Sequence, residues 1–373
     1  MSRTTLLIIK FYFRYKFNEL CLLNSLKLTD FKIMNIKYKY TFLLLFLILI
    51  ICFFVNIGLG SVSIPLKDIF NSLFGISTNE SWQYIIQNYR LPKAITAILV
   101  GSGLGISGLL MQTLFKNPLA GPFVLGITSG ASLGVAMVIM GSSLFGGILA
   151  TFLISEWSIV IAASLGSFLV LLSVLIVSSK VRDTMAILII GLMFGSITSA
   201  VVSVLSYFSS AEELQQYIFW GFGSLGDLQW KELKIFSLIY LMGIAFSILS
   251  IKGLNTLLLG ENYAKSLGLN IKQSRLHIII STSLLAGTIT AFAGPIAFIG
   301  LAVPHLTRQI FNTSNHKILL PAVFLFGAIL MLICDSIAQL PNTDYTLPIN
   351  AITSLIGAPV VVWLLIRKRK MIF

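Results

Sequence analysis

Long apolar runs alternate with short polar segments along most of the chain. Runs of about 20 apolar residues can cross a bilayer as helices, because a helix satisfies its backbone hydrogen bonds internally. The pattern predicts about ten such spans, near residues 41–59, 92–114, 120–140, 158–178, 185–206, 233–250, 276–293, 296–311, 318–338 and 347–366. The third and eighth runs are rich in Gly and Pro. We therefore expect an all-α, polytopic membrane protein whose membrane domain covers residues 40–370.

Composition supports this interpretation and excludes an ordinary soluble domain. Of the 373 residues, 57% are hydrophobic and 10% are charged, whereas soluble domains carry about 25% charged residues. The formal net charge of +13 could indicate nucleic-acid binding. Membrane proteins also collect Lys and Arg in their cytoplasmic loops, so we expect a lipid bilayer as the partner and no nucleic acid.

The distribution of basic residues tests the span assignment. If both termini are cytoplasmic, the cytoplasmic side carries Lys39, Lys116, Lys180, Arg182, Lys252, Lys265, Lys272, Arg275, Arg308, Lys317 and the run Arg367 to Lys370. The other side then carries only Lys67, Arg90, Lys93, Lys231 and Lys234. This asymmetry follows the positive-inside rule and predicts a multi-pass protein of the inner (cytoplasmic) membrane.

The first 39 residues are predicted to form a cytoplasmic N-terminal tail. A second methionine, Met34, directly precedes Lys37, Lys39 and the first long apolar run, so we expect translation to start there. An amphipathic extension lying on anionic lipid is the alternative.

Few ionisable side chains lie within the predicted spans. Asp335 is expected near the outer end of the ninth span, where a carboxylate can bond a neighbouring helix. His305 has no acidic, Cys or His partner at helical spacing, which favours a packing role over metal binding. The three cysteines, Cys21, Cys52 and Cys334, show no metal-ligand spacing. We therefore predict no metal site and no cofactor.

The segment Gly101 to Gly108 places small residues on successive helical turns, which predicts close helix packing. Its glycine spacing does not match a phosphate loop, and the chain carries no nucleotide-binding signature. We therefore expect no enzymatic activity. If ATP drives the protein, a separate subunit must bind it.

An ordered series of motifs resembles one family of transporters. The motifs are Arg90-Leu-Pro-Lys93, Gly105-Ile-Ser-Gly-Leu-Leu-Met-Gln112, Lys116-Asn-Pro-Leu-Ala120, Pro122 to Ala131, Phe219 to Leu225, Leu258 to Gly268, Ala293 to His305, Asp335 to Ala338, Leu347-Pro-Ile and Gly357-Ala-Pro359. The chain resembles the FecCD family of ABC importer permeases over roughly residues 40–370.

The resemblance implies a homodimer with ten spans per copy, two ATPase subunits that bind ATP, and an extracytoplasmic binding protein that delivers the ligand. It favours iron(III)-siderophore complexes as substrate, with cobalamin or haem as alternatives. A secondary transporter driven by ions is a further alternative, although it would need more buried carboxylates than Asp335 alone.

The resemblance also suggests roles for particular residues. It assigns the cytoplasmic segment 258–275 to docking on the ATPase, through Leu258, Gly260, Glu261, Tyr263, Ala264, Leu267 and Gly268. It assigns Arg90, Lys93 and Gln339 to docking of the binding protein, where Lys93 and Gln339 stand at positions at which the family often has arginine. It assigns the fifth span, with Gly191, Gly195, Ser196 and Ser199, to the translocation path.

Overall fold

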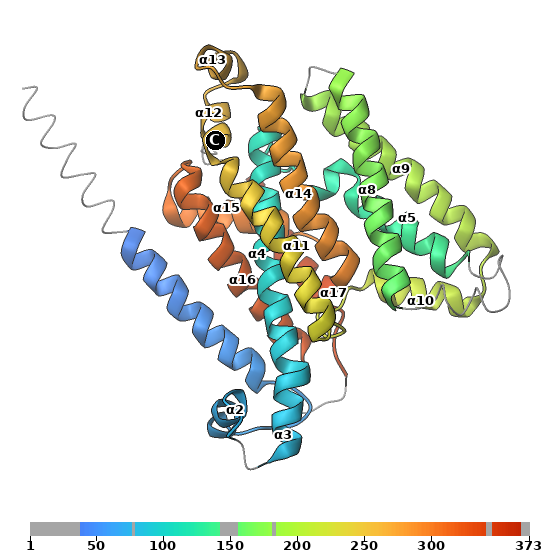
Figure 1. Cartoon of the computed structure of the whole chain (residues 1–373), viewed down its shortest axis with the longest axis vertical. Helices are drawn as coiled ribbons and strands as arrows, with labels where there is room; N and C mark the ends of the chain where they lie inside the picture. The colour runs from blue at the N-terminus through green and yellow to red at the C-terminus, as the bar shows by residue number, and fades with distance from the viewer. Residues whose placement is uncertain (1–37, 77–78, 142–155, 181–183, 341–344, 367–373) are drawn as a thin grey trace, which may run out of the picture. The chain divides into compact units, whose positions relative to one another are not determined.

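The computed structural model describes residues 38–76, 79–141, 156–180, 184–340 and 345–366 (Figure 1). These residues form helices, and no β-strand is found within those ranges beyond an isolated backbone bridge between Gln339 and Thr346. The all-α prediction is therefore confirmed for the described ranges.

The chain divides into two units, Met1–Leu47 and Ile48–Phe373. Within the first unit, residues 38–47 are helical. The predicted tail up to residue 37, including Met34, and the basic run from Arg367 lie outside the described residues. The predicted boundary between residues 39 and 40 stays a prediction.

The helices follow the apolar runs in order. They are Tyr38–Gly58, α2 (Leu66–Leu73), α3 (Glu80–Ile85), the π-helix η1 (Ile86–Arg90), α4 (Leu91–Phe115), the 3₁₀ helix η2 (Pro122–Leu125), α5 (Ile127–Ile139), α8 (Glu156–Lys180), α9 (Thr184–Phe208), α10 (Ala211–Gly221), α11 (Trp230–Leu249), α12 (Ile251–Leu258), α13 (Glu261–Ser266), α14 (Ile271–Ala293), α15 (Ile299–Phe311), α16 (His316–Ala338) and α17 (Ile349–Ile366).

Nine of the ten predicted spans each overlap one of these helices, and the span at 120–140 covers η2 and α5. Within the described residues, 7 helices are long and apolar enough to cross a membrane, and Ile127–Ile139 and Ile349–Trp363 are shorter apolar helices. The two irregular runs correspond to α5 and α15, which have 13 residues each. A multi-pass membrane protein is therefore supported, whereas the total of ten spans and the cytoplasmic placement of both termini stay predictions.

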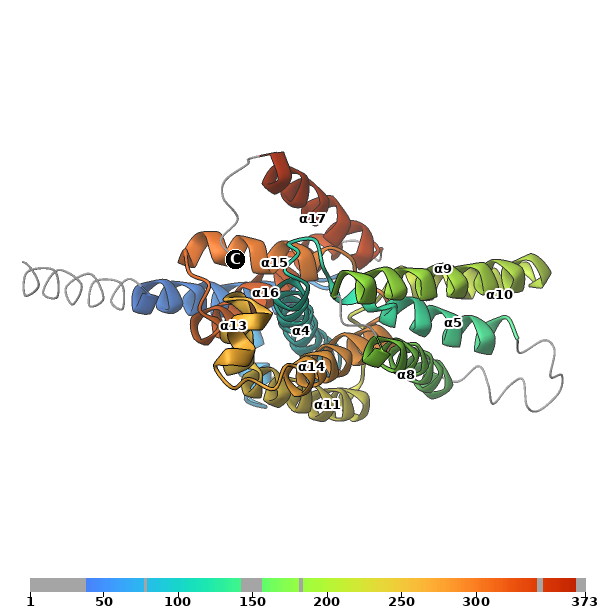
Figure 2. The same ribbon diagram turned by 90° about the horizontal axis from the view of Figure 1, so that it is seen from above.

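Helix α4 lies at the centre of the second unit, with α11, α14, α15 and α16 packed around it (Figure 2). Its glycines permit this arrangement. An added methyl group at Gly101 would lie on the carbonyl oxygen of Gly327 in α16, and one at Gly108 would lie on the carbonyl oxygen of Gly300 in α15. The predicted close packing along this segment is confirmed: backbones meet where side chains would hold them apart.

A second group consists of α5, α8 and α9, which lie side by side in both views (Figures 1 and 2). Helix α5 contacts both α8 and α9, and the backbones of Gly130 and Gly166 meet at the α5–α8 crossing. Helix α14 contacts α4, α5 and α8, and so joins this group to the central one.

Substituting Gly108→Ala is expected to lower the free energy of unfolding by about 3 kcal/mol. The methyl group meets backbone of α15, which cannot rotate away as a side chain could, so the cost lies at the upper end of that for overpacking. Unfolding in detergent can be followed by labelling Cys334, which is fully buried in α16, with the other two cysteines replaced by serine. Gly221→Ala is the matched control, because its added methyl group has no neighbour within 4 Å. Equal losses in the two variants would contradict this account of the helix crossing.

Candidate functional site

The predicted docking segment, residues 258–275, runs from the last residue of α12 through α13 into the first turn of α14. Two glycines with positive φ bound α13: Gly260 at 105° and Gly268 at 81°. Side chains rarely adopt these backbone angles, so glycine permits the chain to turn sharply at both ends of this helix. The segment is therefore a defined protrusion at one end of the unit (Figure 1).

The large apolar side chains in and next to α13 point outward. Ala264 is fully buried against the rest of the chain, whereas Leu259, Tyr263 and Leu267 are 62%, 57% and 59% exposed. A solvated helix normally buries its large apolar side chains and exposes its polar ones. The reversed arrangement leaves an apolar surface, which we call the α13 surface, defined by Leu259, Tyr263 and Leu267. Surfaces of this kind typically mark an interaction site.

Polar contacts fix the protrusion in place. The Arg275 guanidinium forms a salt bridge of 2.5 Å with the Glu261 carboxylate, which joins the start of α13 to α14. The side chain of Asn270 accepts a hydrogen bond of 3.2 Å from the backbone N–H of Gln273 and so caps α14. These contacts fix α13, and with it the α13 surface, against the start of α14.

Beneath the protrusion, a hydrogen-bonded chain connects α12 to α16 and α4. The Asn255 side-chain oxygen lies 2.8 Å from Nδ1 of His316 and accepts a bond of 2.9 Å from its backbone N–H. On the other side of the ring, Nε2 lies 2.9 Å from the Thr113 hydroxyl at the end of α4. His316 is almost fully buried. These bonds therefore connect α12 directly to α16 and, through the His316 ring, to α4.

Asn255→Ala is expected to lower the free energy of unfolding by about 1–2 kcal/mol, because the His316 backbone N–H loses its acceptor in a largely buried place. Unfolding of the purified protein in detergent measures the change. Asn262→Ala, at an exposed position of α13, should leave stability within about 0.5 kcal/mol of wild type. The same loss in both variants would show that the hydrogen-bonded chain contributes nothing.

Two residues of α15 at this end of the bundle bond to α4 and to the segment that follows it. Arg308, counted at the sequence level among the cytoplasmic charges, is buried and donates a hydrogen bond of 2.7 Å to the Gln112 side chain. His305 Nε2 lies 2.8 Å from the Pro118 carbonyl oxygen. The packing role expected for His305 is confirmed. Within the described ranges, no cluster of three or more His, Cys, Asp or Glu side chains could hold a metal.

At the opposite end, the three residues predicted to dock a binding protein lie around one cavity of about 320 Å³, which Tyr345 and Thr346 also line. Arg90 is buried and donates to the carbonyl oxygens of Ile57 and Gly58, at the end of the first helix. It therefore satisfies the last carbonyl groups of that helix. Its role in docking stays a prediction.

Lys93 and Gln339 share a buried carboxylate. The Asp335 side chain accepts bonds from Lys93 at 3.2 Å, from Asn56 at 2.9 Å and from Gln339 at 2.6 Å. We call these four residues the Asp335 cluster. It joins the first helix, α4 and α16 with all three donors directed at one acceptor. The bonding role expected for Asp335 is confirmed, and docking by Lys93 and Gln339 stays a prediction.

The small residues of α9 fall into two groups. Gly191 is buried, with its carbonyl oxygen against Gly126, and Gly195 lies against the Ser129 side chain. Ser196 and Ser199 are exposed, and the Ser196 hydroxyl donates to a carbonyl of its own helix. The two glycines thus pack α9 against α5 and the residues before it. The lining of a translocation path by all four residues stays a prediction.

A short non-helical segment separates α14 from α15. Asn350, at the start of α17, supports it: its side-chain oxygen accepts from the Ala297 backbone N–H at 3.1 Å, and its Nδ2 donates to the Gly221 carbonyl at the end of α10. Irregular backbone at membrane depth requires such partners. Sequence reasoning missed Asn350, and also Asn56, Asn255 and His316. The available signal was a polar side chain within or beside an apolar run.

Comparisons of the sequence and of the structure with known proteins find the same class of membrane transporter. The model of the FecCD transport family matches residues 48–367. The hemin transport system permease protein HmuU of Yersinia pestis is 36% identical over 85% of this chain and 93% of its own length. The vitamin B12 import system permease protein BtuC of Klebsiella pneumoniae is 36% identical over 77% of this chain and 84% of its own length. A solved inward-facing structure of a metal-chelate type ABC transporter superposes with a TM-score of 0.75 at 33% identity, over 88% of this chain and 99% of that chain.

Proposed function

This chain belongs to the FecCD transport family, and from that premise we propose that it is the permease subunit of an ABC importer for iron(III)-siderophore complexes in the inner (cytoplasmic) membrane. The α13 surface carries the proposal: three large apolar side chains are exposed on a braced protrusion, as a docking site for a second protein requires. In this proposal the second protein is the ATPase.

The proposed mechanism is alternating access driven by ATP on two partner ATPases. The ATPases move the α12–α13 protrusion, and the chain from Asn255 through His316 to Thr113 passes that displacement to α16 and α4. A ligand delivered by an extracytoplasmic binding protein then crosses between two copies of the permease. The permease contributes binding and movement and performs no covalent chemistry.

The features of α9 support a homodimer. Ser196 and Ser199 are exposed there beside the apolar residues Met193 and Ile197. Small side chains such as those of the two serines allow a second helix to approach closely, as at an interface between two copies. We propose that this side of α9 faces the partner copy across the path.

The substrate is the finer part of the proposal. The named relatives transport hemin and vitamin B12, and the similar structure is of the metal-chelate type. These ligands are bulky, and the small residues of α9 suit a wide path. Haem and cobalamin are therefore the alternatives to an iron(III)-siderophore.

Uptake by cells distinguishes these ligands. A strain lacking the gene is expected to grow poorly under iron limitation when a siderophore is the only iron source, and to recover when the gene is restored. Radiolabelled iron uptake, with haem and cyanocobalamin in parallel, identifies the ligand. Loss of haem or cobalamin uptake alone would replace the siderophore assignment and leave the importer assignment intact.

A further inference from the structure

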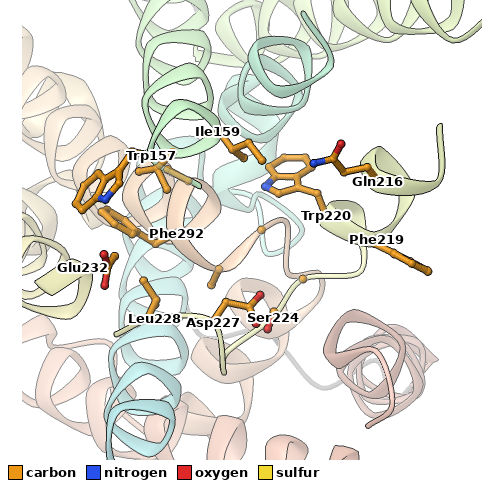
Figure 3. A pocket seen from close by; sticks show the side chains of 15 residues that line it. Trp157, Ile159, Gln216, Phe219, Trp220, Ser224, Asp227, Leu228, Glu232 and Phe292 are labelled. Atoms are coloured by element: carbon orange, nitrogen blue, oxygen red, sulfur yellow. The ribbon is translucent and has the colours of Figure 1, made fainter. Parts of the chain in front are cut away.

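A cavity of about 300 Å³ lies between α8, α10, α11 and the end of α14 (Figure 3). It is at the end of the bundle predicted to face outward, and none of the residues in the proposed docking or path sites lines it. Its volume is at the lower end of that of small-molecule sites.

The cavity combines aromatic walls with two carboxylates. Trp157, Trp220 and Phe292 line it, and Glu232 lies near Trp157 and Phe292, with Asp227 lower in the same view (Figure 3). None of its lining residues is Lys, Arg or His. The lining of the pocket therefore carries two acidic side chains and no basic one.

One carboxylate oxygen in this pocket lacks a partner. Oε2 of Glu232 is buried and makes no hydrogen bond within the described part of the chain. An ionised carboxylate in such a place costs free energy unless a cation or a donor reaches it. The aromatic rings beside it also attract cations, through the negative charge density of their faces.

We propose that this cavity is a binding site for an organic cation, an ammonium group carried on an apolar body. The carboxylates of Glu232 and Asp227 supply the charge, and Trp157, Trp220 and Phe292 enclose the apolar part. The site stands apart from the proposed transport substrate, because its chemistry selects for positive charge on a small apolar group.

Choline and its uncharged carbon analogue 3,3-dimethyl-1-butanol provide a matched pair of probes. The full-length permease is placed in nanodiscs of phosphatidylglycerol, which has no ammonium group. Trp82, Trp230 and Trp363 are replaced by phenylalanine, so that the remaining fluorescence of Trp157 and Trp220 reports binding. Choline is expected to bind at least about tenfold more tightly than the alcohol. Equal affinities would overturn the proposal.

Variants test the residues. Glu232→Gln keeps the size of the side chain and is expected to weaken choline binding about tenfold or more. Glu212→Gln, which removes an exposed acid of α10 outside the cavity, should change binding less than twofold. If Glu232→Gln does not fold, Asp227→Asn at an exposed position takes its place with the same criterion. Unchanged binding in the folded variant would overturn the proposal.

The lipid arm identifies the source of the cation. Adding phosphatidylethanolamine to the nanodiscs weakens choline binding if the ammonium headgroup of a lipid is the natural occupant. It leaves choline binding unchanged if the cation comes from solution. Both results support an ammonium site and assign its occupant.

Discussion

Substituting Leu267→Glu is expected to reduce ATP-driven uptake to the level seen without the ATPase. Leu267 is 59% exposed beside Tyr263, so the change leaves the permease core intact and places a charge in the proposed docking contact. Central apolar residues of an interface contribute about 2 kcal/mol or more, so binding of the ATPase should weaken at least about 30-fold. Copurification of the ATPase and uptake by proteoliposomes measure both effects.

The control for this substitution is Ile76→Glu, which introduces the same charge at a residue that is 70% exposed, in the connection after α2. It should copurify the ATPase normally and transport at the wild-type rate. Normal ATPase binding by the Leu267→Glu variant would contradict the role of the α13 surface. Loss of ATPase binding and transport in both variants would show that the defect comes from an added charge at any exposed position.

Substituting Asp335→Ala is expected to lower the free energy of unfolding by about 3 kcal/mol. The carboxylate is 3% exposed and accepts bonds from Lys93, Asn56 and Gln339. Its removal leaves these donors without their shared acceptor, and breaking a buried pair typically costs about 3–5 kcal/mol. The lower value applies because the Lys93 side chain is 21% exposed. Unfolding in detergent, followed by labelling of Cys334, measures the loss.

A double substitution separates the ion pair from the packing around it. Lys93→Met combined with Asp335→Leu removes both charges and retains apolar volume, so it should recover much of the stability lost in Asp335→Ala. If Asp335→Ala unfolds at the same denaturant concentration as wild type, the Asp335 cluster does not stabilise the fold.

The membrane helices could be predicted because hydropathy responds directly to the bilayer. Seven helices of the described residues are long and apolar enough to span it. The break between α14 and α15 was predicted as well, between the spans that end at residue 293 and begin at residue 296. It falls at Gly294-Pro295 inside a continuous apolar region, and Asn350 supports it from a distant part of the chain.

The docking segment could be located from its motif, although not oriented. The alternation of small and apolar residues predicts an amphipathic helical turn. In such a turn at a solvated surface, Leu267 would be expected to be buried. The chain instead buries Ala264, because a small side chain lets α13 lie close to its support. Only the folded chain shows that Tyr263 and Leu267 remain exposed.

The polar clusters depend on distant pairs that a single sequence does not specify. Asn56 and Asp335 are separated by 279 positions, and Asn255 and His316 by 61. The sequence singles out Asp335 as an ionisable residue within a span, whereas Asn56, Asn255 and His316 do not stand out in their own segments. Their roles follow from the packing of the first helix, α4, α12 and α16, which the apolar pattern alone leaves open.

The most direct test of the account is ligand uptake by proteoliposomes that contain the permease with its ATPase and binding protein. Accumulation of an iron(III)-siderophore, or of haem or cobalamin, is expected only when all three proteins and ATP are present. Uptake should fail with the permease alone. Accumulation by the permease alone, driven by an ion gradient without ATP, would contradict the account.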